Sequence, residues 1–343
     1  MTIQEVWDNA REVMAPNCRA CKVCDGKACR GEIPGVGGMG DSSSWTACMD
    51  FLKSVKLNMD TVYDYHGTDT ALSMFGNSYD YPVFIAPIGG MGGFNYNSAM
   101  TLGEYSQTMA EGALDAGILS FVGGNDAMGG KQFEAGLRVT RDMGGRCVVT
   151  VKPYANELML PCFRALEAAG AVAVASDIDA AGFANMRERA NSVNPKGVAE
   201  LRELAESVKI PFVLKGIMTA AGAVKAAEAG CYAIIVSTHG GRVITSAPST
   251  CEVLPEIRAA VGDRLKIIVD GGIRSGTDIF KAIALGADAV MIGRPYAVAV
   301  YGGGREGVAL YTRKLGEELR HTMLLCGASS LAEISPKMLR LPK

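Results

Sequence analysis

The sequence predicts an α/β protein folded as a (β/α)8 TIM barrel, with an N-terminal Cys-rich, helical extension and C-terminal helices. The first observation behind this prediction is a repeat in which an Ala-rich helical end leads through a glycine into a short apolar strand. The repeat occurs at residues 114–124, 167–177, 227–238 and 284–294. Glycine just beyond a helix allows the left-handed turn through which the chain re-enters a sheet.

The second observation is that these strands are apolar throughout instead of alternating, as expected for parallel strands buried on both faces. Four further apolar segments bring the number of predicted strands to eight: residues 81–87, 146–153, 210–216 and 265–272. The third observation is that amphipathic helices fit most of the gaps, at residues 98–116, 157–169, 197–208, 219–229 and 275–285. Eight strands that mostly alternate with helices favour a closed barrel over the alternative, a doubly wound open sheet.

The rest of the chain extends this barrel. Residues 1–80 form a predicted N-terminal extension with a Cys-rich loop, and residues 81–343 hold the barrel and the C-terminal helices. No Pro- or Ser-rich linker interrupts the chain, so we expect one structural domain overall.

Composition excludes several classes of partner. Apolar residues make up 48% and charged residues 20% of the 343 positions, and the net charge of −2 gives no reason to expect nucleic acid. No apolar run approaches the roughly 20 residues of a membrane span, and the amphipathic helix predicted at residues 1–14 does not resemble a signal peptide. Together with ten cysteines, which a reducing compartment leaves unpaired, these features predict a cytoplasmic protein.

Charged side chains stand where the predicted strands end, and in such barrels chemistry collects at the carboxyl ends of the strands. The stretch "STHGGR" places His239 and Arg242 directly after an apolar strand, while Asp177 and Lys215 end two others. Taken singly, each of these is as often a surface ion pair or part of a turn. Together they are typical of an active site in which a base and a cation that binds a substrate carboxylate lie at the same rim of the barrel.

The last two strands carry a pattern typical of a phosphate site. Their glycines allow the backbone to approach a ligand, and a helix opens at Ser275, whose N-terminus favours anions. Arg274 and Arg294 add charge-assisted donors. The alternative is that the glycines only make tight turns and that the arginines are solvated.

These segments resemble a known family. "PFVLKGIMTA", "IIVSTHGGR", "IIVDGGIRSGTDIFKAIALGADAVMIGRP" and "LRHTMLLCGASSLAEI" look like the FMN-dependent 2-hydroxy-acid oxidases and dehydrogenases, a group that includes glycolate oxidase and lactate oxidase. The resemblance runs from about residue 80 to 335 and is densest from 210 to 295. The combination of motifs is specific to the family, whereas other FMN barrels share the phosphate segment.

The resemblance implies a role for each matching residue. His239 would take a proton from the substrate, Arg242 would bind its carboxylate, and Asp177 would pair with the histidine. Lys215 would stabilise the reduced, anionic flavin ring, with Ser237 nearby. The remaining flavin contacts would come from strand one, at Ala86, Pro87 and Ile88, and from the ribityl and phosphate site, at Asp270, Gly271, Gly272, Arg274, Gly293 and Arg294.

Three departures from the family pattern bear on the substrate. No tyrosine matches the one that touches substrate near the family's N-terminal helix. On strand three the family's Gln-x-Tyr appears as Thr150, Val151 and Lys152, which puts Thr150 at a flavin contact and Lys152 at a substrate contact. The second substrate arginine is missing after Asp177, because Arg187 and Arg189 are displaced in sequence. That half of the site for the substrate carboxylate is therefore either absent or rebuilt, with Lys152 as the candidate.

Four cysteines lie within twelve residues. Cys18, Cys21, Cys24 and Cys29 read C-x2-C-x2-C-x4-C, one residue longer in the last gap than the bacterial ferredoxin run. Thiolate-only ligation suits an iron–sulfur cluster or a structural zinc, and zinc sites usually split their ligands into two separated pairs. The third alternative is a Cys-rich loop without metal.

The leading hypothesis is FMN-dependent oxidation of a small-molecule 2-hydroxy acid to a 2-oxo acid, with oxygen, a quinone or a redox protein as the electron acceptor. The alternative is an FMN-dependent isomerase like the type 2 isopentenyl diphosphate isomerase, against which His239 with Arg242 speaks. A third hypothesis is a non-catalytic module that binds metal or carries electrons. Barrels of the resembling family tend to form tetramers, so a homotetramer is expected.

Overall fold

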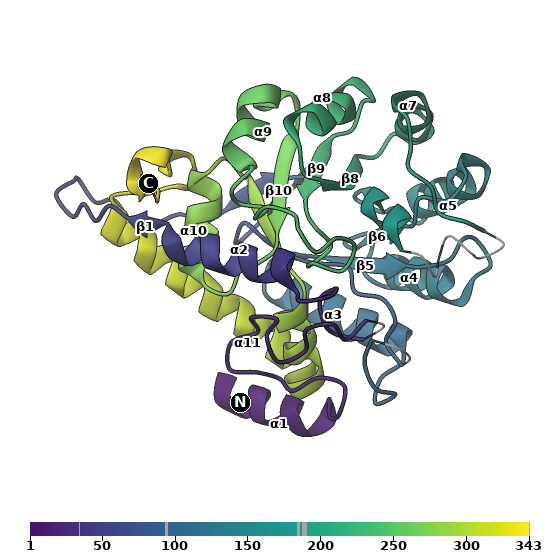
Figure 1. Cartoon of the computed structure of the whole chain (residues 1–343), viewed down its shortest axis with the longest axis horizontal. Coiled ribbons are helices and arrows are strands. Elements are labelled where there is room, and N and C mark those ends of the chain that lie inside the picture. The colour runs from purple at the N-terminus through teal and green to yellow at the C-terminus, as the bar shows by residue number, and fades with distance from the viewer. Residues whose placement is uncertain (34, 93–94, 184–185, 187–190, 343) are drawn as a thin grey trace.

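Eight parallel strands close into a barrel in this computed structural model, which describes residues 1–33, 35–92, 95–183, 186 and 191–342 (Figure 1). Parallel pairing of Val290 with Val83 joins the last strand to the first, which confirms the predicted (β/α)8 fold. In order around the barrel, the strands are β4 (Val83–Ile85), β5 (Leu119–Gly124), β6 (Val148–Val151), β7 (Val174–Asp177), β8 (Phe212–Ile217), β9 (Ala233–Val236), β10 (Lys266–Asp270) and β11 (Ala289–Ile292).

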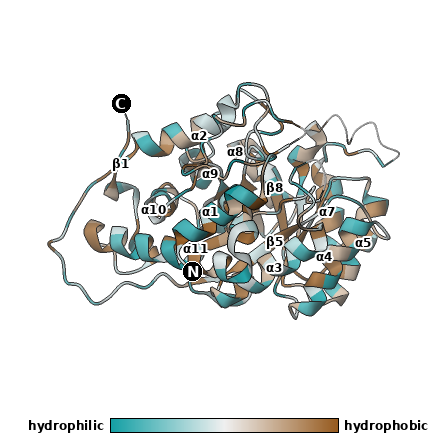
Figure 2. Ribbon diagram, turned by 90° about the horizontal axis from the view of Figure 1, so that it is seen from below, coloured by the Kyte–Doolittle hydropathy of each residue, from teal (hydrophilic) through white to brown (hydrophobic). Residues whose placement is uncertain are grey.

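Helices follow the strands and carry hydrophilic and hydrophobic residues in alternation along their lengths (Figure 2). They are α3 (Leu102–Asp115), α4 (Lys131–Asp142), α5 (Asn156–Ala168), α7 (Val198–Glu206), α8 (Ala220–Glu228), α9 (Leu254–Val261), α10 (Gly276–Ala284) and α11 (Arg294–Cys326), the last kinked at Gly304. The ranges of α4 and α9 were not predicted. In α4 the buried face includes Gly136 and Thr140 and is therefore not a continuous apolar stripe. None of the helices in the described part of the chain is long and apolar enough to cross a membrane.

The glycines of the sequence repeat take the conformation that the repeat requires. Gly117, Gly170, Gly230 and Gly286 all have positive φ, from 66° to 118°. Side chains other than glycine rarely adopt this region. These turns let each helix reverse directly into the next buried strand.

The barrel interior is filled from the amino ends of its strands. Phe84 and Phe121 lie with ring centroids 6.0 Å apart inside the barrel. A hairpin of β2 (Leu72–Met74) and β3 (Asn77–Tyr79) packs Phe75 against Phe84, with centroids 5.9 Å apart. This hairpin closes the amino-terminal end of the barrel, so the opposite end is the one left for a ligand.

The N-terminal extension packs against the C-terminal helix. The first helix, α1 (Ile3–Val13), lies along α11, where a Cβ on Gly302 would stand 1.9 Å from the Val6 carbonyl oxygen. After the Cys-rich segment comes α2 (Ser43–Ser54), and β1 (Lys56–Leu57) pairs with β12 (Leu339–Arg340) near the end of the chain. The segment between α1 and α2 is thereby held over the carboxyl ends of the barrel strands.

The aromatic interior gives a stability prediction. Replacing Phe84 by Ala removes a fully buried ring that contacts Phe75, Tyr79 and Phe121. We expect the free energy of unfolding to fall by about 3–5 kcal/mol, measured by urea denaturation. The control is Val62→Ala, because Val62 is 91% exposed and its truncation should change that free energy by less than about 0.5 kcal/mol. Equal effects of the two variants would contradict the described interior.

Candidate active site

His239 stands in a strained turn at the end of β9. Its φ is +55°, and Gly240 and Gly241 follow with φ of +63° and +73°. Non-glycine residues held in this region cost of order 1–3 kcal/mol and cluster at functional sites. The His239 backbone N–H donates to Ser237 Oγ (3.0 Å), and the Ser237 hydroxyl in turn donates to Asp270 Oδ2 (2.8 Å). This network fixes the turn to the end of the neighbouring strand β10.

The imidazole contacts a carboxylate that sequence reasoning missed. His239 Nδ1 lies 3.0 Å from Asp179 Oδ1, whereas Nε2 lies 4.0 Å from Asp177 Oδ2. Asp177 is the last residue of β7 and pairs with Lys152, while Asp179 lies two residues further on, in the 3-10 turn η1 (Ile178–Gly182). The resemblance assigned the histidine's partner to Asp177, but the hydrogen-bond contact in the structure is with Asp179. The second acidic residue of "SDID" was the available signal.

Lys215 lies beside the same carboxylate. Its Nζ is 3.3 Å from Asp179 Oδ2 and 3.4 Å from His239 Nδ1. The next residue, Gly216, has φ of +99°, and a Cβ on it would stand 2.6 Å from Asp179 Cβ. Only glycine at this position allows Asp179 to approach the end of β8.

Burial and these close charges shift the pKa values of the group. Burial lowers the pKa of His239, although the Asp179 carboxylate acts in the opposite direction. Burial opposes the charge of Asp179 and of Lys215 as well. His239 and Lys215 nevertheless lower the pKa of Asp179, and the carboxylates of Asp179, Asp270 and Asp177 raise that of Lys215. At neutral pH the histidine is therefore neutral, between an ionised carboxylate and a charged lysine.

Two of the predicted arginines are held by residues 35–37, the mouth segment, which crosses the carboxyl-terminal end of the barrel. Arg242 donates to the carbonyl oxygens of Gly35 and Gly37 and to Asn95 Oδ1. Burial, with the charge of Arg294 nearby, lowers the pKa of Arg242 to about 10, so it stays protonated at neutral pH. Arg294 donates to the Val36 carbonyl oxygen (2.9 Å).

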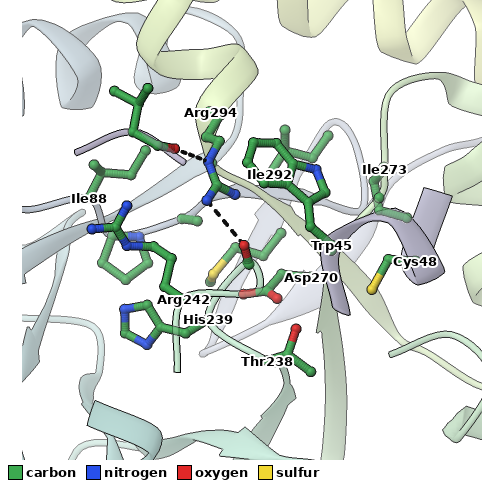
Figure 3. A pocket seen from close by; sticks show the side chains of 18 of the residues that line it. Trp45, Cys48, Ile88, Thr238, His239, Arg242, Asp270, Ile273, Ile292 and Arg294 are labelled. Carbon is green, nitrogen blue, oxygen red and sulfur yellow. Dashed lines mark hydrogen bonds between the residues drawn. The ribbon is translucent and has the colours of Figure 1, made fainter. Parts of the chain in front are cut away.

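An aromatic ring supports the second of these arginines. The Arg294 guanidinium carbon lies 3.5 Å from the Trp45 ring centroid, a cation–π contact. Figure 3 shows Arg294 and Trp45 on one side of the pocket and Arg242 beside His239 on the other. Neither Trp45 nor Asn95 was anticipated, because both lie far along the chain from the residues that they contact.

One pocket brings together most of the predicted flavin residues. Its lining includes Ala86, Pro87, Ile88, Lys215, Asp270, Gly271, Gly272, Arg274, Gly293 and Arg294, together with His239 and Arg242. At its far end Arg274 donates through Nε and Nη2 to the Cys24 carbonyl oxygen, at 3.0 and 2.7 Å. The predicted phosphate and ring residues therefore share one wall of the barrel mouth.

A neighbouring cavity of about 350 Å³ shares His239 and Arg242 with this pocket. It is also lined by Thr150, Lys152 and Asp177, and by the apolar side chains of Ile33, Met39, Phe183 and Met186. Lys152, predicted as a substrate contact, is buried in this wall and paired with Asp177. Arg187 and Arg189, the displaced arginines, lie outside the described residues.

The chain is similar in sequence to known oxidases over part of its length. Over 145 residues the chain is 42% identical to an L-lactate oxidase of Lactobacillus jensenii, and over 136 residues it is 44% identical to a 2-hydroxyacid oxidase of Dictyostelium discoideum. These matches cover 42% and 40% of this chain but only 36% and 35% of the two relatives.

Structural similarity extends over the whole chain. A mandelate oxidase variant with (S)-mandelic acid superposes with a TM-score of 0.79 at 27% identity, covering 100% of this chain and 99% of that one. The family model described as FMN-dependent dehydrogenase matches residues 36–198 and 191–341. The chain therefore belongs to the FMN-dependent dehydrogenase family.

Proposed function

We propose that this protein uses FMN to oxidise a 2-hydroxy acid to the corresponding 2-oxo acid. The observation that carries the proposal is a partly buried, neutral histidine, hydrogen-bonded to an ionised carboxylate, beside a protonated arginine at one cavity. Oxidation of a 2-hydroxy acid requires two groups of the protein: a base that accepts the substrate proton and a cation that binds the substrate carboxylate. The lactate, mandelate and 2-hydroxyacid oxidases to which the chain is similar support the same reaction class.

The residues of the pocket fit FMN. The side-chain oxygens Asp270 Oδ1, Thr150 Oγ1 and Thr238 Oγ1 are buried and have no hydrogen-bond partner among the described residues. Each such group costs about 1–3 kcal/mol unless it is satisfied, and a flavin offers the polar ring edge and ribityl hydroxyls to satisfy them. A Cβ added at Gly293 would meet nothing closer than 3.5 Å, so the backbone there leaves room for a ligand.

The residues that would hold FMN follow from this fit. Arg274 and Arg294 would hold the phosphate, beside the glycines Gly271, Gly272 and Gly293 that line the same pocket. Asp270 would accept from the ribityl chain. Lys215, buried and protonated, would lie at the ring edge that becomes anionic on reduction.

In the proposed mechanism His239 accepts the substrate proton on Nε2. The ionised Asp179 carboxylate can only accept hydrogen bonds, so Nδ1 carries the proton of the neutral imidazole and leaves Nε2 free as the base. Asp179 then stabilises the imidazolium that forms. Bound FMN supplies the two-electron acceptor.

Substrate orientation would come from Arg242 and Lys152. A guanidinium has five N–H donors, and the three acceptors that Arg242 contacts leave donors for a substrate carboxylate. Lys152 would supply the second cation on the opposite wall of the cavity, with its charge balanced by Asp177. The hydrogen bonds of Arg242 with the carbonyl oxygens of Gly35 and Gly37 hold its guanidinium at the same cavity as His239.

The experiment that tests the reaction is an anaerobic absorbance spectrum before and after addition of a panel of 2-hydroxy acids. Bleaching of the flavin bands by one class of acid is the expected result, because the substrate delivers two electrons. A bound flavin that no acid in the panel reduces would contradict the proposed reaction. In that case non-redox turnover of an allylic diphosphate would favour the isomerase alternative.

Replacing the proposed base should abolish fast flavin reduction. We expect His239→Asn to lower the rate of reduction by a reactive acid about 100- to 10,000-fold, the usual contribution of a general base. Stopped-flow absorbance measures this rate, and bound FMN per chain should stay unchanged. The matched control is His321→Asn, since His321 is exposed on α11. Similar rates in both variants would rule out His239 as the base.

The phosphate site predicts a second effect. Arg274→Met should raise the dissociation constant for FMN about 10- to 100-fold, because a hydrogen bond to a charged group is worth about 1.5–3 kcal/mol. Quenching of FMN fluorescence measures the constant. Arg141→Met, which changes an exposed arginine on α4, serves as the control. Unchanged affinity in the Arg274 variant would place the phosphate elsewhere.

The shifted pKa of His239 predicts the pH dependence. Only the neutral imidazole accepts a proton, so kcat/KM should rise with pH and level off below neutrality, because burial lowers this pKa from its ordinary 6.5. Asp179→Asn removes the charge that raises the pKa, so the acidic limb should move to lower pH. The plateau should also fall by about tenfold or more, since the imidazolium loses its partner.

A pH profile of each protein checks this, with Asp142→Asn, at an exposed position, as control. An acidic limb that stays in place or moves to higher pH would contradict the assignment of Asp179.

The electron acceptor, the homotetramer and the cytoplasmic location stay predictions.

A further inference from the structure

The four clustered cysteines line a cavity that adjoins the proposed flavin pocket and shares Arg274 and Arg294 with it. The cavity measures about 570 Å³ and lies between α1, the Cys-rich segment and the start of α11. Cys18, Cys21, Cys24 and Cys29 are all partly buried in its wall and are free thiols. The proposed oxidation uses none of them.

These thiols lie within twelve residues of sequence, and all four line the wall of the same cavity. The segment is held in place, because Arg19 and Glu32 form an ion pair (2.9 Å) that spans it and Arg274 binds the Cys24 carbonyl oxygen.

The spacing of the thiols is too wide for one tetrahedral ion. Four sulfurs at 2.3 Å from zinc lie about 3.8 Å from one another. Among the residues that the structure describes, only Asp177, Asp179 and His239 bring three such ligand atoms within 4.8 Å of one another. Two lysines already neutralise that second group, at Asp177 and Asp179. The cysteines instead line a cavity of about 570 Å³, which has room for several atoms.

The charge of the wall suits an anionic occupant. Six cationic side chains line the cavity, against a single carboxylate at Asp25: Arg11, Arg19, Lys22, Arg274, Arg294 and Lys314. Arg11, Arg19 and Lys314 already pair with carboxylates outside the cavity lining. Among the described residues, Arg274 and Arg294 donate to main-chain carbonyl oxygens and form no ion pair. The net negative charge of a cluster held by four thiolates would lie beside these two arginines.

We propose that Cys18, Cys21, Cys24 and Cys29 ligate an iron–sulfur cluster in this cavity. Thiolate ligation by four cysteines is the arrangement of [2Fe–2S] and [4Fe–4S] centres. The cluster would adjoin Arg274 and Arg294, the arginines at the phosphate end of the pocket. The site does not depend on the reaction proposed above, because its ligands and its cavity are separate from His239 and Arg242.

The experiment is metal and sulfide analysis of the full chain purified without oxygen. We expect iron and acid-labile sulfide in equal amounts, about two or four of each per chain, and an electron paramagnetic resonance signal after reduction with dithionite. Cys21→Ser and Cys24→Ser should each lower both contents at least tenfold. Bound FMN should stay unchanged, which separates loss of the cluster from loss of the fold.

The matched control is Cys326→Ser, in a buried thiol at the end of α11, which should keep the full iron and sulfide content. About one zinc per chain in place of iron would overturn the proposal. So would protein that takes up neither iron nor sulfide on anaerobic incubation with ferrous iron, sulfide and a thiol reductant. Equal iron loss in Cys24→Ser and Cys326→Ser would also overturn it.

Discussion

The contact of Asp179 with both His239 and Lys215 is the interaction on which the candidate site depends. All three groups are buried or nearly so, and a charge removed from water is costly unless its partners are close and well oriented. Here the ionised carboxylate lies between a cation and an imidazole whose protonated form it stabilises. Removing Asp179 would leave Lys215 with Asp270 and Asp177 as its more distant partners. The electrostatics of the base and of the proposed flavin edge are therefore coupled through one side chain.

The backbone around this contact is shaped to admit it. Gly216 leaves the space that a Cβ would fill, the 3-10 turn after β7 brings Asp179 over the barrel, and the left-handed turn at His239 presents the imidazole. Of these three features, the positive φ of His239 is the strained one. A strained residue held among buried charges is typical of a functional site.

Much of the fold could be predicted from the sequence because each buried strand is a continuous apolar run and the repeat glycines sit at helix ends. The strand-end positions of Lys215, His239 and Arg242 followed from the same pattern, since a barrel brings those ends together. Asp179 was missed although the sequence shows it two residues after Asp177, because its place beside His239 depends on a turn that no periodicity describes. Trp45 and Asn95 reach the site from segments far away along the chain, and such contacts leave no local signal.

The mouth segment has a consequence for the order in which the protein folds. Arg242 and Arg294 bond to carbonyls of residues 35–37, and these contacts span 207 and 258 residues of sequence. Synthesis delivers that segment first, yet its partners emerge only after β9 and β11, the sixth and eighth strands of the barrel. Loop-closure entropy and contact order both place such pairings late. The pocket should thus acquire its final shape only after the barrel has closed, and a nascent chain halted before Arg294 would expose both the Cys-rich segment and the unfinished sheet edge.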